Sequence, residues 1–148
     1  MEFSEAIIFE WFRAKVIIKI VMIKDFLIIS CIGKNDKLGL RINKEFFTYN
    51  LKNEKNNSES LVSEIMVFLN NHNIKLDDNF SILINQGPGS FSKIRVSLAV
   101  AKGLDISKKV QLFGFVDGDL RVFDQENIEK LLDKNLFEKK LIKPIYLS

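Results

Sequence analysis

The segment that most constrains this chain covers residues 85–104, where a strand passes through a glycine-rich turn into a helix. The turn reads Gly87-Pro88-Gly89-Ser90, and the apolar run Phe80–Ile84 before it is typical of a strand buried on both faces. The helix is apolar almost all the way round, with Arg95 and Lys102 forming its charged ridge. A helix of this kind must be covered on both sides, so one side packs on a sheet and the other needs a second cover.

Two candidates exist for that second cover. The helix carries small side chains that would let a neighbouring helix approach closely, namely Ser97, Ala99, Ala101 and Gly103. An amphipathic helix is predicted from Ser58, its expected N-cap, to about His72, and it could supply the cover inside the chain. A partner molecule is the other candidate, and the residues alone leave both open.

The remaining patterns predict an α/β domain. Five apolar runs have strand character, and they are 25–32, 37–42, 45–51, 80–84 and 110–116. Helices are expected over 58–72, from the Gly87–Ser90 turn to about 105, and over 125–137, with an extended tail over 141–147. The order β-β-β-α-β-α-β-α predicts a mixed five-stranded sheet with packed helices. This is the order of the ribonuclease-H-like core, which also forms one lobe of the actin-like folds.

Composition narrows the class of protein further. A length of 148 residues with 47% hydrophobic content suits one folded domain. The net charge is +3 and the lysines are scattered, which favours a solvated surface over direct nucleic-acid contact. The only cysteine, Cys31, lies in an apolar run, so we expect a buried structural thiol in a chain of the reducing cytoplasm.

The first 21 residues form a separate case. Their apolar clusters are interrupted by charges, so no run approaches the roughly 20 residues of a membrane span. The order of charges does not match a secretory signal either. We expect residues 1–21 to be a non-native or disordered extension, with Met22 as the natural start, and residues 22–148 to form a single domain that does not enter a membrane.

Candidate chemistry is sparse. Backbone N–H groups of the Gly87–Ser90 turn could hold an anion, but the turn matches neither a Walker loop nor a dinucleotide fingerprint, and a tight structural turn is the favoured interpretation. The first strand has no carboxylate at 28–32, and Asp117 and Asp119 are expected as surface carboxylates. With His72 as the only histidine, we predict no catalytic residue, no metal site and no cofactor.

Several stretches resemble the TsaB (YeaZ) family. The residues Gly87-Pro88-Gly89-Ser90-Phe91-Ser92-Lys93-Ile94-Arg95-Val96, followed by Ala101-Lys102-Gly103-Leu104, are similar to the family's GPGSFTGLRIG and AKGLA motifs. Ser58-Glu59 and the helix after it resemble the family's HSE-type segment, with Asn57 where histidine is usual. The ending Pro144-Ile145-Tyr146-Leu147 is similar to the family's PxYLR terminus, with Ser148 in place of arginine.

The chain departs from the family pattern at several positions. The acid of the family's DTS-like first strand is missing near Ser30-Cys31, Lys93 and Ser97 replace glycines, and Ser92 replaces threonine. Members usually have two actin-like lobes, whereas this chain is expected to keep the first and to replace most of the second with 125–137. Because the first-strand acid and most of the second lobe are missing, we do not expect a nucleotide to bind between two actin-like lobes.

The resemblance implies a non-catalytic scaffold in bacterial synthesis of threonylcarbamoyladenosine beside the tRNA anticodon. The implied partner is a TsaD-type catalytic subunit in a heterodimer. A TsaE-type ATPase and a second copy of the chain are further candidates, and tRNA is contacted only indirectly. The resemblance favours an intermolecular contact for the apolar helix. The interface candidates are Leu61, Ile65, Phe91, Ile94, Arg95, Leu98, Ala99 and Ala101.

Two alternatives from other functional classes remain. One is a nucleotide-binding phosphotransfer protein that uses the Gly87–Ser90 turn, and ATP with magnesium should then raise its melting temperature. The other is a small RNA-binding module, whose affinity should fall steeply with salt.

Overall fold

The computed structural model describes residues 24–52, 57–134, 136–137 and 142–146, so the expected extension 1–21 lies outside the described residues. The elements, in chain order, are β1 (Phe26–Ser30), β2 (Lys37–Ile42), β3 (Glu45–Asn50), α2 (Ser58–Asn71), β4 (Ser81–Asn85), α3 (Phe91–Lys108), β5 (Gln111–Phe115), the 3-10 turn η1 (Asp117–Asp119) and α4 (Gln125–Asp133). The predicted order of strands and helices is confirmed. No helix in the described part is long and apolar enough to cross a membrane.

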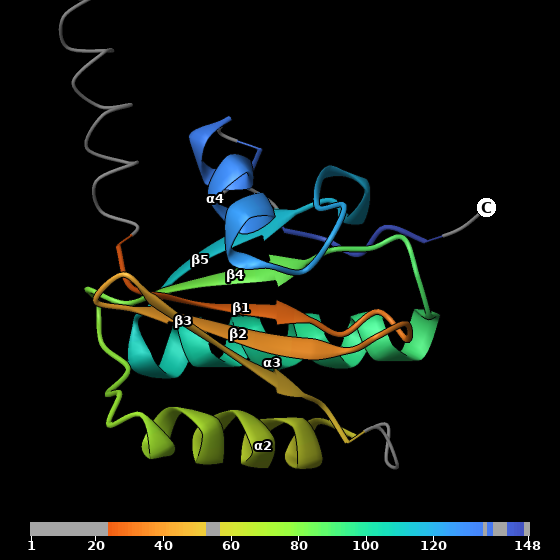
Figure 1. The fold of residues 1–148 in the computed structure, drawn as a ribbon. Coiled ribbons are helices and arrows are strands. Elements are labelled where there is room, and N and C mark those ends of the chain that lie inside the picture. The colour runs from red at the N-terminus through yellow and green to blue at the C-terminus, as the bar shows by residue number, and fades with distance from the viewer. Residues whose placement is uncertain (1–23, 53–56, 135, 138–141, 147–148) are drawn as a thin grey trace, which may run out of the picture.

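The strands form one mixed sheet in the order β3-β2-β1-β4-β5. β1 runs antiparallel to β2, where Leu27 faces Leu40, and parallel to β4, where Leu27 faces Ile82. Helices α2 and α3 cover one face of the sheet and α4 covers the other (Figure 1). All residues of β1 and β4 are buried, because helices lie over both of their faces.

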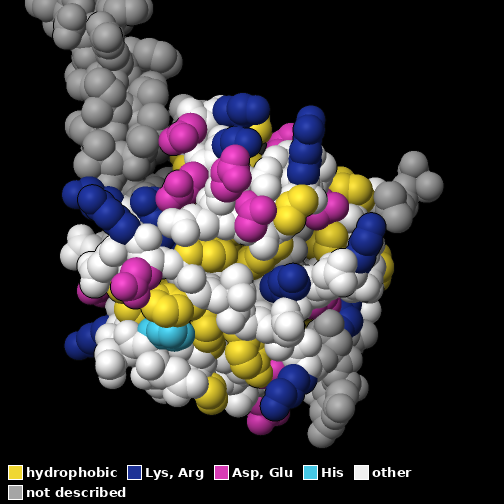
Figure 2. All heavy atoms as spheres, in the orientation of Figure 1, with side chains coloured by type: hydrophobic (Ala, Val, Ile, Leu, Met, Phe, Trp, Pro, Cys, Tyr) yellow, Lys and Arg dark blue, Asp and Glu magenta, His cyan; other side chains and the backbone are white. Residues whose placement is uncertain are grey.

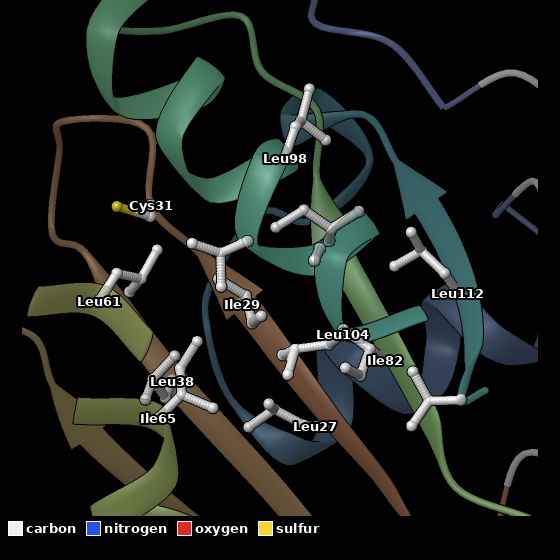
Figure 3. Close-up of a cluster of buried hydrophobic side chains, with 14 of the residues drawn as sticks. Leu27, Ile29, Cys31, Leu38, Leu61, Ile65, Ile82, Leu98, Leu104 and Leu112 are labelled. Carbon is white, nitrogen blue, oxygen red and sulfur yellow. The ribbon is translucent and has the colours of Figure 1, made fainter. Parts of the chain in front are cut away.

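The hydrophobic core has two halves, one on each face of the sheet. Alternate residues of β1 divide between them, with Leu27 and Ile29 facing α2 and α3, and Phe26 and Ile28 facing α4. Figure 3 shows the first half, in which Ile65 of α2 and the β1 side chains converge. The mixed five-stranded sheet with packed helices is confirmed, and it positions the Gly87–Ser90 turn where β4 passes into α3.

Several element boundaries differ from those predicted. The prediction that Ser58 caps α2 is wrong, because the N-cap is Asn57, whose side chain accepts a hydrogen bond of 2.7 Å from the amide of Ser60. α4 ends at Asp133 and does not reach Phe137, since Phe137 packs edge-on against Phe113 from beyond the helix.

The other boundaries shift by only a few residues. β1 ends at Ser30, before the turn, and β4 begins one residue later than predicted and runs to Asn85. α3 continues past residue 105 to Lys108 and stops at Lys109, whose backbone is left-handed.

Candidate functional site

The Gly87–Ser90 turn is wedged between two other segments. Gly87 has a φ of +103°, and a Cβ there would lie 2.5 Å from the carbonyl oxygen of Ile145 in the C-terminal segment. A Cβ on Gly89 would lie 2.5 Å from the carbonyl oxygen of Ile32 in the loop after β1. Backbone approaches this close leave no room for a side chain, so the sequence requires glycine at both positions.

Hydrogen bonds inside the chain use the polar groups of this turn. The amide of Gly87 donates to Oδ1 of Asn85 at 3.0 Å, and the amide of Ser90 donates to the carbonyl oxygen of Ile32 at 2.7 Å. The fully buried Asn85 also donates from Nδ2 to Oγ of Ser30 at 3.1 Å and to Oδ1 of Asp117 at 3.0 Å. Two amides of the turn are therefore already paired, which favours a structural turn over an anion cradle.

The C-terminal segment completes this site. The amide of Ile145 donates to the carbonyl oxygen of Gln86 at 2.8 Å, and Gly89 and Tyr146 form a parallel bridge. The ring of Tyr146 lies against that of Phe91, with ring centres 4.6 Å apart. The predicted extended tail is confirmed over 142–146, and both ends of the predicted range lie outside the described residues.

A buried carboxylate organises the loop after β1, and the sequence patterns did not single it out. Asp36 is buried, and its Oδ1 accepts from the amides of Ile32, Gly33 and Lys34 at 3.0, 2.8 and 3.1 Å. Its Oδ2 lies 3.5 Å from Nζ of Lys93 in the first turn of α3. The lysine that replaces a family glycine thus has its counter-ion in the same chain. The turn sequence Gly-Lys-Asn-Asp was the available signal, since aspartate side chains commonly accept from nearby amides in turns.

The second substituted position is also satisfied internally. Ser97 is fully buried, and its hydroxyl donates a hydrogen bond to the carbonyl oxygen of Ile94 at 3.0 Å. The carbonyl oxygen of Cys31 lies 3.5 Å from the same hydroxyl and is a second possible acceptor. Cys31 itself is buried, as predicted, and burial together with the nearby Asp36 carboxylate raises the pKa of its thiol to about 12. A thiol with so high a pKa is not a nucleophile at neutral pH, so Cys31 has a structural role.

The predicted interface residues separate into two groups. Five of them are buried in the core half beneath α2 and α3 and cannot contact a partner directly, namely Leu61, Ile65, Ile94, Leu98 and Ala101. Figure 3 shows Leu61, Ile65 and Leu98 in this core. Phe91, Arg95 and Ala99 are exposed, and they share one side of α3 with Lys102 and Ile106. We call these last five residues the α3 outer stripe. α3 is therefore not buried all round, because its inner side meets the sheet and α2 and its outer side meets solvent.

The α3 outer stripe combines apolar and cationic side chains. Phe91 is 56% exposed and Ile106 is 81% exposed. The guanidinium carbon of Arg95 lies 5.0 Å from the centre of the Phe91 ring, within the range of a cation–π contact. The Phe91 ring is also in contact with the ring of Tyr146, so these three side chains form one continuous cluster at the start of α3.

Other candidate residues have local structural roles. His72 lies among aromatic rings, 4.3 Å from the ring centre of Phe47 and 5.2 Å from that of Phe68, and Figure 2 shows the histidine in cyan among hydrophobic side chains. Asp119 is exposed, as expected, whereas Asp117 is half-buried and accepts from Asn85. In the part of the chain that the structure describes, no three histidine, cysteine, aspartate or glutamate side chains gather closely enough to hold a metal ion.

The fold defines an α/β protein of the actin-like, ribonuclease-H-like class. YeaZ from Pseudomonas aeruginosa superimposes with a TM-score of 0.57 at 15% identity, over 73% of this chain and 50% of that one. A second structure, an uncharacterized protein with similarity to peptidase YEAZ from Pseudomonas aeruginosa, gives 0.58 at 16% identity, over 73% and 49%. No family profile matches the sequence.

A curated relative adds evidence from sequence. The tRNA threonylcarbamoyladenosine biosynthesis protein TsaB of Buchnera aphidicola subsp. Schizaphis graminum is 30% identical over 81 residues, which is 53% of this chain and 39% of the relative. Together with the motif residues and the shared fold, this match supports the similarity of the chain to the TsaB (YeaZ) family. The chain spans half or less of the length of the relatives it matches.

Proposed function

We propose that this chain is a non-catalytic partner subunit in tRNA threonylcarbamoyladenosine biosynthesis and binds a TsaD-type catalytic subunit through the face formed by α2 and α3. The observation that carries the proposal is the α3 outer stripe, which exposes Phe91 and Ile106 on the helix that bears the family motif. The curated TsaB relative supports the choice of pathway.

The composition of the stripe suits a protein interface. Aromatic and arginine side chains are enriched at interface hot spots, and large apolar side chains in contact with water gain free energy when a partner covers them. Phe91 and Arg95 are stacked, Ala99 is small enough for close approach, and Lys102 would lie in the polar rim. A partner helix could therefore lie along α3 with its backbone near Ala99.

The buried interface candidates support this surface from below. Ile94, Leu98 and Ala101 fix the inner side of α3 against the sheet, and Leu61 and Ile65 fix α2 beside it. A surface held in its bound shape loses little conformational entropy on association. In this proposal these five residues position the interface, and the exposed residues make the contacts.

The proposal extends to the assembly around the pair. A TsaE-type ATPase joins the complex through the catalytic subunit, and tRNA is bound by the partners and not directly by this chain. In the absence of the catalytic subunit, the same stripe pairs two copies of the chain. The complex works in the cytoplasm, where its tRNA substrate is found.

The interface is tested by binding of the catalytic subunit from the same organism. Ala99→Asp should weaken binding at least tenfold, because a larger side chain would block the close approach of the partner and its carboxylate would lose water on burial, while the melting temperature stays near that of the wild type. Gly118→Asp is the matched control, since a Cβ on Gly118 would meet no atom within 4 Å and Gly118 lies in η1, outside α2 and α3. Equal retention of the partner by Ala99→Asp and Gly118→Asp would overturn the proposed interface. Ala101→Asp is unsuitable, because Ala101 is fully buried.

The biological role is tested by complementation. Expression of the chain in a bacterium depleted of TsaB should restore threonylcarbamoyladenosine in tRNA, measured by mass spectrometry of digested tRNA. The Ala99→Asp variant should fail to restore it and Gly118→Asp should succeed. Lack of any restoration by the wild-type chain together with its native catalytic subunit would contradict the proposed role.

A further inference from the structure

The outer edge of β3 is a row of backbone groups at the end of the sheet. β3 is the terminal strand in the order β3-β2-β1-β4-β5 (Figure 1), and among the described residues β2 is the only strand that pairs with it. All of β3 pairs with β2 in an unbroken register, from Glu45 with Ile42 to Asn50 with Lys37. No bulge within β3 bends this edge away, and β3 contains neither lysine nor proline, two residues that commonly protect an edge strand from pairing.

The turn between β2 and β3 determines which backbone groups point outward. Asn43 and Lys44 both have a positive φ, which is typical of a two-residue type I′ turn, so the two residues that flank the turn exchange hydrogen bonds. Bonding to β2 then recurs at every second residue of β3. The amide of Leu51 donates to the carbonyl oxygen of Asp36 at 3.0 Å and continues the same alternation. The amides and carbonyls of the intervening residues point away from β2, namely those of Phe46, Thr48 and Asn50.

The sequence of β3 is complementary to a second copy of itself. If two copies run antiparallel with Thr48 opposite Thr48, the outward groups of Phe46 meet those of Asn50 in the copy, and each group finds a backbone partner. In this register Phe47 stands opposite Tyr49 on the face toward α2, where both are half-buried. Aromatic pairs across two strands are stabilising, and the paired stretch contains no charged residue that would face a like charge.

An exposed valine on α2 extends this surface. Of the apolar side chains of α2, Val67 alone is exposed, at 55%. The hydroxyl of Tyr49 and the amide of Lys52 both donate to Oε1 of Glu64, at 3.1 and 3.0 Å, so the Glu64 side of α2 lies beside the end of β3. Val67 follows Glu64 by three residues and shares this side of the helix. A copy paired at the β3 edge places its own α2 beside this one, which accounts for an apolar side chain among polar positions.

We propose that a second copy of this chain pairs antiparallel with the outer edge of β3, with Thr48 opposite Thr48, so that the two sheets become one continuous sheet. Val67 of each copy contacts the other copy beside this sheet. The α3 outer stripe lies on a different helix and stays free in this pair, so two chains joined at β3 can each bind a catalytic subunit. The pairing itself requires no catalytic subunit and does not rest on the proposed function.

Sedimentation velocity of the full chain with the substitution Ala99→Asp measures this pairing. That substitution blocks association through the α3 outer stripe, so a dimer that remains uses another surface. A dimer is expected, and adding Thr48→Lys should weaken it at least tenfold, because two lysines would face each other at the centre of the paired strands. Thr48 is exposed, so the melting temperature should not change. Asn79→Lys is the matched control, because Asn79 is exposed and lies in the loop before β4.

Cross-linking tests the register of the two strands. In a hydrogen-bonded antiparallel pair the opposite Cα atoms are about 5.5 Å apart, within the range of about 4.4–6.8 Å for a disulfide. Oxidation of Thr48→Cys should therefore give a covalent dimer, and oxidation of Asn79→Cys should not. The native Cys31 is buried and does not compete.

Three results would overturn the proposal. The first is an Ala99→Asp chain that stays monomeric up to about 100 µM, a concentration at which a micromolar contact is nearly saturated. The second is a dimer that Thr48→Lys leaves unchanged, and the third is equal cross-linking of Thr48→Cys and Asn79→Cys. The single variant Thr48→Lys should bind the catalytic subunit as well as the wild type does, so failure of the β3 contact is distinct from failure of the proposed interface on α3.

Discussion

Removal of the Asp36 carboxylate should destabilise the fold more than any change of an exposed charge. The Asp36 side chain is fully buried, and Lys93, 3.5 Å away, has a side chain only 14% exposed. Breaking a buried ion pair by removing one partner costs about 3–5 kcal/mol, because the other charge stays buried without a counter-ion. Asp36→Ala also leaves the amides of Ile32, Gly33 and Lys34 without their acceptor.

Three variants of the Asp36–Lys93 pair should differ in how much they lower the free energy of unfolding. Asp36→Ala should cost about 4 kcal/mol, since Lys93 keeps some access to water. Asp36→Asn retains an oxygen for the amides and loses only the charge, so about 2–3 kcal/mol is expected. Lys93→Met keeps the apolar stem and leaves Asp36 with its amide donors, so about 1–2 kcal/mol is expected. At about 2–4 °C per kcal/mol for a chain of this size, Asp36→Ala lowers the melting temperature by roughly 8–16 °C.

Urea unfolding followed by far-ultraviolet circular dichroism measures these differences. The double variant Asp36→Asn/Lys93→Met closes a double-mutant cycle, and a coupling free energy of about 1–2 kcal/mol is expected. Lys108→Met is the control, because Lys108 is exposed at the end of the same helix. A loss below about 0.5 kcal/mol in Asp36→Asn, or a coupling free energy of zero, would refute the assignment of a stabilising buried pair.

Two further predictions follow from a cap and a thiol. In urea titrations, Asn57→Ala should lower the free energy of unfolding by about 1 kcal/mol, because Asn57 is the N-cap of α2. Ser58→Ala should lower it by much less. A larger loss in Ser58→Ala than in Asn57→Ala would contradict the assignment of Asn57 as the cap. The Cys31 thiol has a pKa of about 12 in the fold against 9.0 in the unfolded chain, so the fold retains a proton that the unfolded chain loses, and stability falls as pH rises above about 9. Between about pH 8.5 and pH 10.5 the wild type should lose about 2 kcal/mol more than Cys31→Ala, and equal losses would contradict the buried thiol.

The sequence was sufficient to predict the order of elements and the kind of sheet. The apolar runs around Ile28 and Leu83 are continuous, and burial on both faces leaves few other arrangements for them. The end of α4 was less predictable, because Phe137 fits a helical period but packs on Phe113 after the helix has ended. The spacing of apolar residues shows which side chains are buried, but it does not show whether the backbone at those residues is helical.

The surface of α3 could not be predicted from its residues alone. Alanine and glycine occur on both buried and exposed sides of a helix, so Ala99 and Ala101 look alike in the sequence, although Ala99 is exposed and Ala101 is fully buried. The contact between Asp36 and Lys93 was missed for a different reason. It joins two segments that are distant in the chain, and only the packing of α3 on the loop after β1 brings them together.

The central position of β1 has a consequence for how the chain folds. β1 pairs on one side with β2, which follows almost at once, and on the other side with β4, which comes only after β3 and α2. Short loops close at lower entropic cost, so the antiparallel meander can form first and β4 with β5 must join later. Until they join, one edge of β1 exposes unpaired amides beside apolar side chains, which is a template for pairing with the wrong strand. During synthesis on the ribosome, the chain is therefore most prone to aggregate in the interval between the emergence of β1 and that of β4.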